Sequence, residues 1–344
     1  MDRKSSKYRR AELPDGALEK IPETGGVRRQ AAIIVIAIIL VLLGVTIGVV
    51  VDVVVQMEPE IKSSTPIEAA EESLPTKPLV AASIRKQKSL FSDSLPDQEA
   101  QACLPPFVQM EWNAVASAAP DNMPAVAIVI DDMGLDRSRG SRISALPAPL
   151  TLSFLTYADD LLDQSVDARE AGHEVLAHIP MEPLGSADPG PGALTISADP
   201  REIKQRLDAY LENWSGYVGI NNHMGSKLTG NQEAMNVVIG ELCKRGLLWL
   251  DSRTDAGTVG EITAATFGLP YVGRDVFIDN INARTAIDEQ LRKIETIART
   301  TGQAVAIGHP RDNTILALSD WLPSLKDKGI SLVPITEVVR RVNR

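Results

Sequence analysis

From residue 124 to the end of the chain, short apolar runs alternate with longer stretches of helical periodicity. The expected strands cover 125–130, 150–155, 174–179, 217–220, 247–251, 271–272, 304–308 and 331–333, and the expected helices cover 159–171, 200–213, 231–245, 286–301 and 314–328. This alternation predicts an α/β domain with a parallel sheet, because each helix returns the chain to the same end of the sheet. Seven or eight strands within residues 124–344 suit one barrel-like domain.

Four of the apolar runs lead into residues that can bind a metal ion or transfer a proton. Because the carboxyl ends of parallel strands lie at one edge of the sheet, these side chains are expected to meet there. Two carboxylates and three imidazoles in one place favour a divalent metal ion with an acid/base pair beside it. The residues concerned are Asp131, Asp132, His178, His223 and His309.

These motifs also have structural interpretations that the sequence leaves open. Asp132 could cap the helix that follows it, and His178 could cap a turn. The loop Asn221–Ser226 could serve only as a tight turn, since Asn and Gly adopt such conformations easily. Two further apolar runs end at Asp251 and Asp279, which could form ordinary salt bridges or caps.

The N-terminal part of the chain has the pattern of a membrane anchor. Ala31–Val51 is a run of 21 residues without charge, and a helix of that length spans about 31 Å, or one hydrocarbon core. We expect a retained transmembrane helix over 31–55, since a cleaved signal peptide has a shorter apolar core followed by small residues. Eight Lys and Arg residues precede the run. The positive-inside rule therefore predicts a cytoplasmic segment 1–30, an inner-membrane anchor and a periplasmic remainder.

Between the predicted anchor and the predicted domain lies a stretch without a core-forming pattern. Residues 56–123 are rich in Pro, Ser, Glu, Lys and Gln, which predicts a disordered linker. The chain has two cysteines, Cys103 and Cys243. An oxidising compartment would allow a disulfide, but the placement of one cysteine in the linker and the other in a helix favours the unpaired state.

The order of the motifs resembles that of the polysaccharide deacetylase superfamily, in particular its divergent bacterial branch. The resemblance covers about residues 124–342 and rests on Ile130–Gly134, His178–Glu182, Asn222–Ser226, Asp251–Thr254 with Phe277–Asp279, and Ile307–Pro310. It implies a distorted (β/α) barrel and a divalent metal ion, usually zinc, that polarises a water molecule and an acetamide carbonyl. It further implies that Asp131 is the base, that Asp132 and His178 are metal ligands, and that His309 is the acid.

The sequence departs from the family's pattern at two motifs. Glu182 stands where the family has a second metal-binding histidine, so either Glu182 or His223 would supply the third ligand. We favour His223, because an Asp/His/His set suits zinc with an open position for water. The family's Arg/Pro/Tyr loop has no counterpart, and Arg253 is a candidate partner for a catalytic carboxylate. Candidates for contacts to the substrate or to the metal ligands are Glu182, Asn222, Asp251, Arg253 and Asp279.

Together these features predict a metal-dependent hydrolase that removes N-acetyl groups from an envelope glycan outside the cytoplasm. The net charge of −10 argues against nucleic acid as a partner, because phosphate binding needs a basic surface. One alternative is a barrel that keeps its metal without turnover and acts as an envelope glycan- or protein-binding module. Another is an amide or ester hydrolase with a non-glycan substrate, which would use the same residues.

Overall fold

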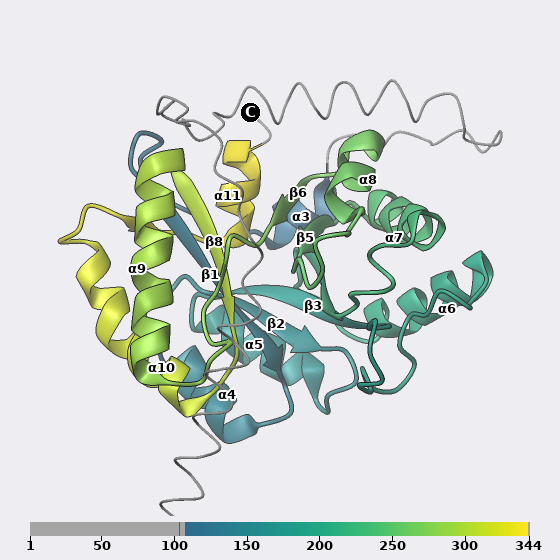
Figure 1. The fold of residues 1–344 in the computed structure, drawn as a ribbon, viewed down its shortest axis with the longest axis horizontal. Helices are drawn as coiled ribbons and strands as arrows, with labels where there is room; N and C mark the ends of the chain where they lie inside the picture. The colour runs from purple at the N-terminus through teal and green to yellow at the C-terminus, as the bar shows by residue number, and fades with distance from the viewer. Residues whose placement is uncertain (1–102, 104–106, 343–344) are drawn as a thin grey trace, which may run out of the picture. The chain divides into compact units, whose positions relative to one another are not determined.

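The computed structural model describes residue 103 and residues 107–342 (Figure 1). The predicted cytoplasmic segment, the predicted membrane anchor and residues 56–102 of the predicted linker lie outside the described residues. Among the helices that the structure describes, none is both long and apolar enough to cross a membrane.

The described residues form one parallel sheet. Its strands are β1 (Ala125–Met133), β2 (Thr151–Leu155), β3 (Glu174–Met181), β4 (Gly219–Met224), β5 (Leu248–Asp251), β6 (Tyr271–Gly273), β7 (Val276–Phe277), β8 (Gln303–Gly308) and β9 (Ser331–Leu332). The strand order is β6-β5-β4-β3-β2-β1-β8-β7, and β9 pairs with the first residues of β1. The predicted parallel α/β architecture is confirmed.

A single extended segment joins the two ends of this sheet. β6 pairs with β5, β7 pairs with β8, and only Arg274 and Asp275 separate β6 from β7. The backbone N–H of Arg274 donates to the carbonyl of Asp251 on β5, and the N–H of Asp275 donates to the carbonyl of Val305 on β8. The segment changes partner between these two residues, which gives the sheet the form of a distorted barrel.

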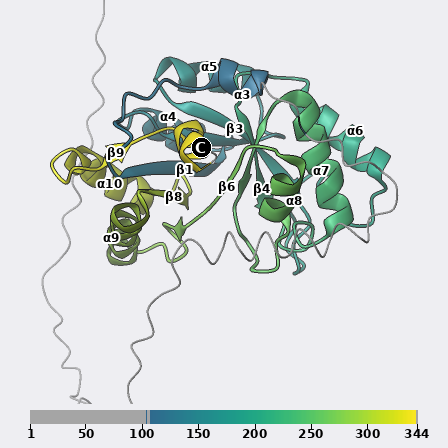
Figure 2. The ribbon, with the colours of Figure 1, turned by 90° about the horizontal axis from the view of Figure 1, so that it is seen from above.

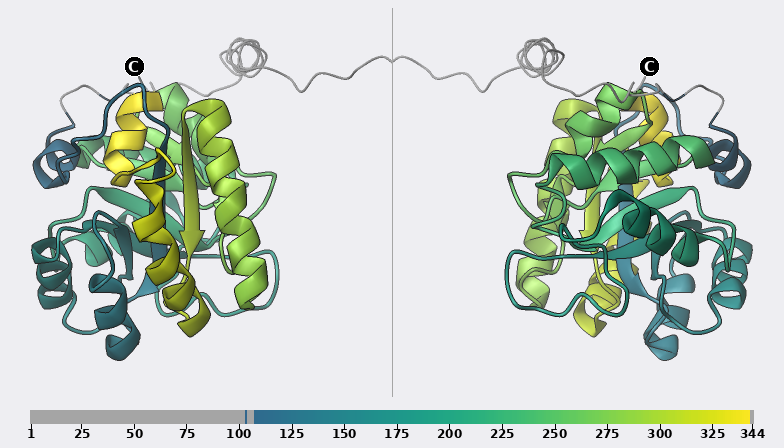
Figure 3. Two further views of the ribbon diagram at one scale, coloured as in Figure 1. Left: turned by 90° about the vertical axis from the view of Figure 1, so that its left-hand side faces the viewer. Right: turned by 90° about the vertical axis from the view of Figure 1, so that its right-hand side faces the viewer.

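Helices surround the outside of the curved sheet (Figures 2 and 3). These outer helices are α3 (Val108–Asn113), α4 (Arg137–Ser144), α5 (Leu161–Glu170), α6 (Pro200–Leu211), α7 (Gln232–Arg245), α8 (Gly260–Phe267), α9 (Arg284–Thr301) and α10 (Asp312–Trp321) with the short 3-10 turn η1 (Leu322–Leu325). A further helix, α11 (Ile335–Val342), lies within their ring. Asp199 and Asn231 cap α6 and α7 with their side chains. The sequence did not indicate α4, because that helix buries only Gly140 and Ile143.

Alternate strand positions separate two groups of apolar side chains. In β1, Val126, Ile128 and Ile130 pack outward against the helices, whereas Ala125 and Val129 belong to a second cluster inside the barrel. That inner cluster includes three apolar residues of α11 (Ile335, Val338 and Val339), and Figure 2 shows α11 within the ring of outer helices. The amino-terminal half of the barrel interior is therefore filled, and a site inside the barrel must lie at the carboxyl ends of the strands.

The structure corrects two expectations for the region before β1. Residues 107–123, assigned to the disordered linker, pack against the domain: Met110 is buried, and the Asn113 side-chain amide donates to the Tyr217 carbonyl over 3.0 Å. Cys103 and Cys243, expected to be unpaired, form a disulfide with their Cα atoms 5.0 Å apart. The pairing arises because the chain before α3 lies against the end of α8, where the Cys103 N–H donates to the Phe267 carbonyl.

Glu174 connects three parts of the fold at the start of β3. Its fully buried carboxylate accepts hydrogen bonds from the Val115 N–H, the Thr336 N–H and the Thr336 hydroxyl, over 3.1, 3.0 and 2.6 Å. Glu174→Ala is expected to lower the free energy of unfolding by about 2–4 kcal/mol, since each buried donor without an acceptor costs about 1–3 kcal/mol. Urea unfolding followed by tryptophan fluorescence measures this. Glu174→Gln should lose less of the free energy of unfolding. An unchanged urea midpoint for Glu174→Ala would contradict the role of Glu174 in holding these parts of the fold together.

Candidate functional site

The inward positions at the carboxyl ends of the strands carry polar side chains. Inward- and outward-facing side chains alternate along each strand here as they do in the core, so residues two apart on one strand face the same way. In β3 and β4, the residue pairs His178 with Asn221 and Pro180 with His223 are in register. The polar layer above the apolar core consists of Asp131, Ser153, His178, Asn221, His223, Ser252 and His309.

A β-bulge allows both adjacent aspartates to reach the site. Between Ile130 and Met133, β1 has one residue more than the facing stretch of β2, and Asp132 adopts a φ of 55°. In a regular strand, Asp131 and Asp132 would point to opposite faces of the sheet. The extra residue and its left-handed backbone turn Asp132 into the barrel beside Asp131. Non-glycine residues held at positive φ cost about 1–3 kcal/mol and concentrate at functional sites.

Asp132, His178 and His223 form a cluster that can hold a metal ion. One potential ligand atom from each lies within 4.8 Å of the others. The Asp132 Oδ1 atom is 2.9 Å from His223 Nδ1 and 3.4 Å from His178 Nε2, yet this buried oxygen accepts no hydrogen bond from the described residues. A buried carboxylate oxygen that faces two imidazole nitrogens without a hydrogen bond fits a shared cation better than a direct contact.

Asn221 orients His178 and Asp131 together. Its side-chain N–H donates to Asp131 Oδ1 over 2.8 Å, so its Oδ1 atom faces His178 Nδ1 at 2.7 Å. An amide oxygen only accepts, which means that His178 carries its proton on Nδ1 and directs the lone pair of Nε2 toward Asp132. The hydroxyl of Ser153 also donates to Asn221 Oδ1, over 2.6 Å.

His309 and Asp279 form a second pair on the opposite side of Asp132. The ring Nδ1 of His309 lies 2.9 Å from Asp279 Oδ1, and its Nε2 lies 3.7 Å from Asp132 Oδ2. The buried Asp279 carboxylate is held by the His309 N–H over 2.8 Å and by the Thr314 hydroxyl over 2.7 Å. Asp279 thus fixes the ring of His309 so that Nε2 points into the site.

The charges of the cluster favour a cation at its centre. Burial is the largest influence on His178 and lowers its pKa, but Asp131 and Asp132 outweigh burial and raise the pKa overall. For Asp132, burial raises the pKa, while His178 and His223 together bring it well below its usual range. Burial dominates for Asp131 and raises its pKa. For His309, burial is again the largest influence, yet Asp279 and the two aspartates of β1 raise the pKa.

The remaining predicted site residues lie away from the cluster. Asn222 and Asp251 occupy outward strand positions: Asn222 accepts from the Ser252 N–H over 3.0 Å, and Asp251 accepts from the Thr258 hydroxyl over 2.8 Å. Glu182 lies one residue beyond the end of β3, where it pairs with Lys227 and accepts from the Ile196 N–H. Arg253 pairs with Glu261 and Asp275 instead of a carboxylate of the site.

Sequence reasoning missed two residues that shape the site. Asn222 was predicted from the sequence to have a role at the site, and Asn221 was not. Asn221 is two residues before His223, however, and in a strand this spacing places both side chains on the same face. Arg274, in the segment that closes the barrel, donates to the carbonyls of Ser252 and Arg253 and lies over the Phe277 ring at 5.1 Å. Phe277 in turn packs against His309, with ring centroids 5.4 Å apart. No sequence motif distinguishes Arg274, because its neighbours come from distant strands.

Comparison with known proteins identifies the family. The sequence model of the divergent polysaccharide deacetylase family matches residues 128–339, which include all of the clustered residues. The chain belongs to this family. The resemblance to the divergent polysaccharide deacetylase family inferred from the sequence is therefore confirmed, and the parallel α/β fold agrees with it.

The chain is also similar to three bacterial proteins. It is 30% identical over 202 residues to an uncharacterized protein of Haemophilus influenzae, a match that spans 59% of this chain and 72% of the relative. It is 32% identical over 211 residues to the uncharacterized protein YibQ of Escherichia coli, spanning 61% of this chain and 66% of that protein. The crystal structure of the uncharacterized protein ATU2773 from Agrobacterium tumefaciens superposes with a TM-score of 0.65 and 30% identity, covering 67% of this chain and 94% of that chain.

Proposed function

We propose that this protein is a metal-dependent hydrolase that removes acetyl groups from an N-acetylated glycan. The observation that carries the proposal is the convergence of Asp132, His178 and His223 between two proton-transfer groups, Asp131 on one side and the His309–Asp279 pair on the other. We further propose zinc as the ion, since a carboxylate and two imidazoles with an open position suit catalytic zinc. A bound ion would supply a polarised water molecule and stabilise negative charge on the acetamide oxygen.

The residues around the cluster supply the proton transfers. Asp131 is buried and has a raised pKa, and its Oδ2 lies 3.6 Å from His178 Nε2, so it can accept the proton of a water molecule placed at the cluster. His309 directs Nε2 toward the site from the other side and can donate a proton to the departing amine. The amide C–N bond breaks, water provides the oxygen of the released acetate, and the glycan keeps a free amine.

Asp279→Asn tests the role of the pair in catalysis. We expect kcat to fall by about 10–100-fold, because residues that orient an active group typically contribute that much. The acid form of His309 exists below its pKa and is lost as the pH rises through that pKa. Removing the negative charge of Asp279 lowers the pKa of His309. The fall of kcat/KM on the basic side of its pH profile should therefore move to lower pH. The control is Thr314→Val, which removes a hydrogen bond to Asp279 without a change of charge and should leave the basic side of the pH profile in place. A pH profile that does not move in Asp279→Asn would refute the role of Asp279 in holding His309.

The decisive experiment for the function combines metal analysis with an activity assay. The full chain, purified in detergent, should contain one divalent ion per molecule and release acetate from N-acetylglucosamine oligomers. Removal of the ion with a chelator should abolish release, and added zinc should restore it. Glycan binding without turnover, with the ion present, would instead support the alternative of a binding module. A full chain that holds no ion would overturn the proposal.

We also propose that the protein is anchored in the inner membrane with its barrel in the periplasm. The uncharged run Ala31–Val51 and the basic residues before it support this placement. The disulfide between Cys103 and Cys243 is the bond expected in an oxidising compartment. Protease added to spheroplasts should digest the barrel, and digestion only after lysis would contradict the topology.

A further inference from the structure

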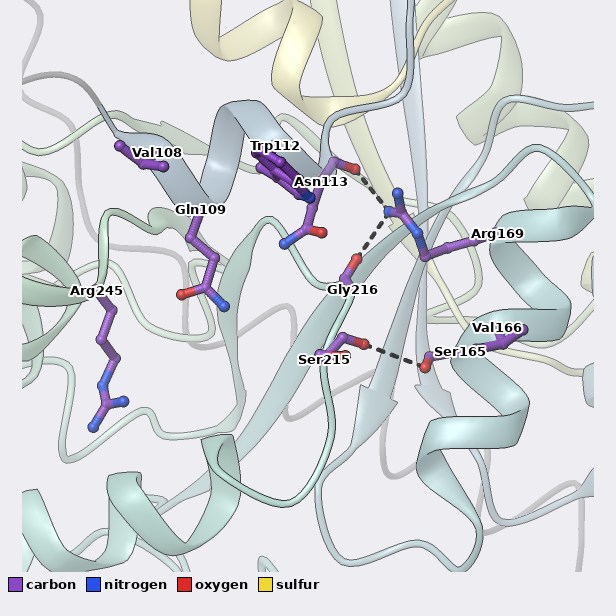
Figure 4. Close-up of a pocket in the computed structure, with 10 residues that line it drawn as sticks. All are labelled: Val108, Gln109, Trp112, Asn113, Ser165, Val166, Arg169, Ser215, Gly216 and Arg245. Atoms are coloured by element: carbon purple, nitrogen blue, oxygen red, sulfur yellow. Dashed lines mark hydrogen bonds between the residues drawn. The ribbon is translucent and has the colours of Figure 1, made fainter.

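A groove lies between α3 and α5, away from the metal cluster. Its volume is about 660 Å³, and its walls come from α3, from α5 and from the loop that leads into β4 (Figure 4). Gly216 of that loop precedes the first residue of β4, whereas His223 lies near the end of the same strand. The groove is therefore near the amino-terminal ends of the strands, and the proposed reaction does not use it.

The two helices that flank the groove expose large apolar side chains one turn apart. Val108 and Trp112 on α3 are 57% and 84% exposed, and Leu162 and Val166 on α5 are 49% and 44% exposed. The exposure of Trp112 stands out, because the other three tryptophans (Trp214, Trp249 and Trp321) are all at most 8% exposed. Contiguous apolar patches with polar rims usually mark sites of protein association.

The charge of the groove is opposite to the charge of the chain. Among the described residues that line it, Arg169 and Arg245 carry charge and none is a carboxylate, although the whole chain carries a net charge of −10. Arg245 pairs with Asp208. Arg169 donates to the carbonyls of Asn113 and Gly216, over 2.7 and 2.9 Å (Figure 4). Among the described residues no carboxylate forms an ion pair with Arg169, so its positive charge is free to attract one from outside.

We propose that this groove binds a helical segment of a partner protein that places apolar side chains one turn apart and a carboxylate at Arg169. A helix laid in an apolar groove presents side chains with the same spacing of three to four residues as the groove's own walls. Trp and Arg are the residue types that most often dominate binding energy at interfaces. An anionic lipid surface would need a cluster of basic residues.

The disulfide fixes one wall of this groove. Cys103 is bonded to Cys243, and α3 begins a few residues later, where the Met110 N–H donates to the Gly246 carbonyl over 2.9 Å. At its other end, α3 is held by the bond from Asn113 to Tyr217 and by the bond from Arg169. Both ends of α3 are thus attached to the barrel, so the groove is preformed and binding does not have to order its wall.

The experiment uses the full chain in detergent and a library of random 16-residue peptides displayed on phage. Selection on the full chain should enrich peptides with two large apolar residues three or four positions apart and an Asp or Glu near them. Trp112→Ala should weaken the binding of a synthetic selected peptide by at least about tenfold, because truncation of a central interface residue typically costs that much. Arg169→Glu should also weaken the binding of this peptide. The same variant should instead bind a peptide in which the acidic residue is changed to Lys.

Several outcomes would overturn the proposal. These are the absence of an enriched pattern, equal binding by the Trp112→Ala variant, or failure of the charge exchange at Arg169. Sedimentation analysis tests for a further outcome that would overturn the proposal. A dimer of the full chain that Trp112→Ala dissociates would identify a second copy of the chain as the occupant of the groove. Binding to vesicles of anionic phospholipid that depends on Trp112 would identify a membrane surface instead. The control is Leu316→Ala, which removes an apolar side chain that is 52% exposed on α10, and which should leave peptide binding unchanged.

Discussion

Asp131→Asn is expected to reduce the kcat of the proposed glycan deacetylation by about 10³-fold, within the range of 10²–10⁴-fold that general acid or base groups contribute. Asparagine has nearly the same shape as aspartate and can still accept the hydrogen bond from the Asn221 side chain. It cannot take a proton from water at neutral pH. The loss should therefore appear in kcat, with little change in KM.

The metal content separates a lost base from a damaged site. Asp131→Asn should keep one bound ion per molecule, because Asp132, His178 and His223 remain in place. Elemental analysis of the purified variant beside the unchanged protein provides this control. Deacetylation that survives in Asp131→Asn at close to the original rate would remove Asp131 from the role of base. Loss of the ion would show that Asp131 is itself a ligand.

His223→Ala is expected to lower the affinity for zinc by more than about 100-fold and to abolish turnover. Even residues that only support the ligands contribute about 10–100-fold to metal affinity, so the loss of a ligand should exceed that range. His223 Nδ1 lies 2.9 Å from Asp132 Oδ1, and its side chain is mostly buried. Competition with a chelating dye measures the affinity directly, without any need for a substrate.

Glu182→Gln is the matched control, because the sequence offered Glu182 and His223 as rivals for the third ligand. Glu182 is bound to Lys227 and to the Ile196 N–H in the structure, outside the cluster. The glutamine variant should therefore bind zinc as tightly as the unchanged protein. The reverse pattern, with weak zinc binding in Glu182→Gln and normal binding in His223→Ala, would exchange the two assignments.

The sequence has no counterpart of the Arg/Pro/Tyr loop, which would have placed an arginine at the site. The structure places a different guanidinium nearby: Arg274, on the segment that closes the barrel, packs over Phe277 beside His309. Burial lowers the pKa of Arg274, and the negative charge of Asp131 acts in the opposite direction. Its position is fixed by bonds to two backbone carbonyls, those of Ser252 and Arg253. A positive charge near Asp131 is thus present, but it comes from a different part of the chain.

The sequence by itself determined the parallel α/β domain and the family. Apolar runs separated by capped helices leave few other arrangements, since each strand must bury both faces and each helix one. The same alternation indicated that Asp131, His178, His223 and His309 would gather at one edge of the sheet. These inferences depend on periodicity and on local caps, which are properties of neighbouring residues.

Only the tertiary structure decided which polar residues face the site. The bulge at Asp132 reverses the direction that strand alternation gives to this side chain, and the end of β3 leaves Glu182 outside. Asp251 ends an apolar run as Asp131 does, yet its position on the outward face directs it to Thr258. Strand register and strand length set these differences, and both depend on contacts with other strands.

The pairing of Cys103 with Cys243 was equally beyond the sequence, because 140 residues separate the two cysteines along the chain. The segment around α3 has a linker-like composition, and its order comes from its contacts with the barrel rather than from its own propensity. Local residue patterns determine which elements form, whereas long-range packing determines which of their side chains meet. For this protein, the chemistry of the site depends on both.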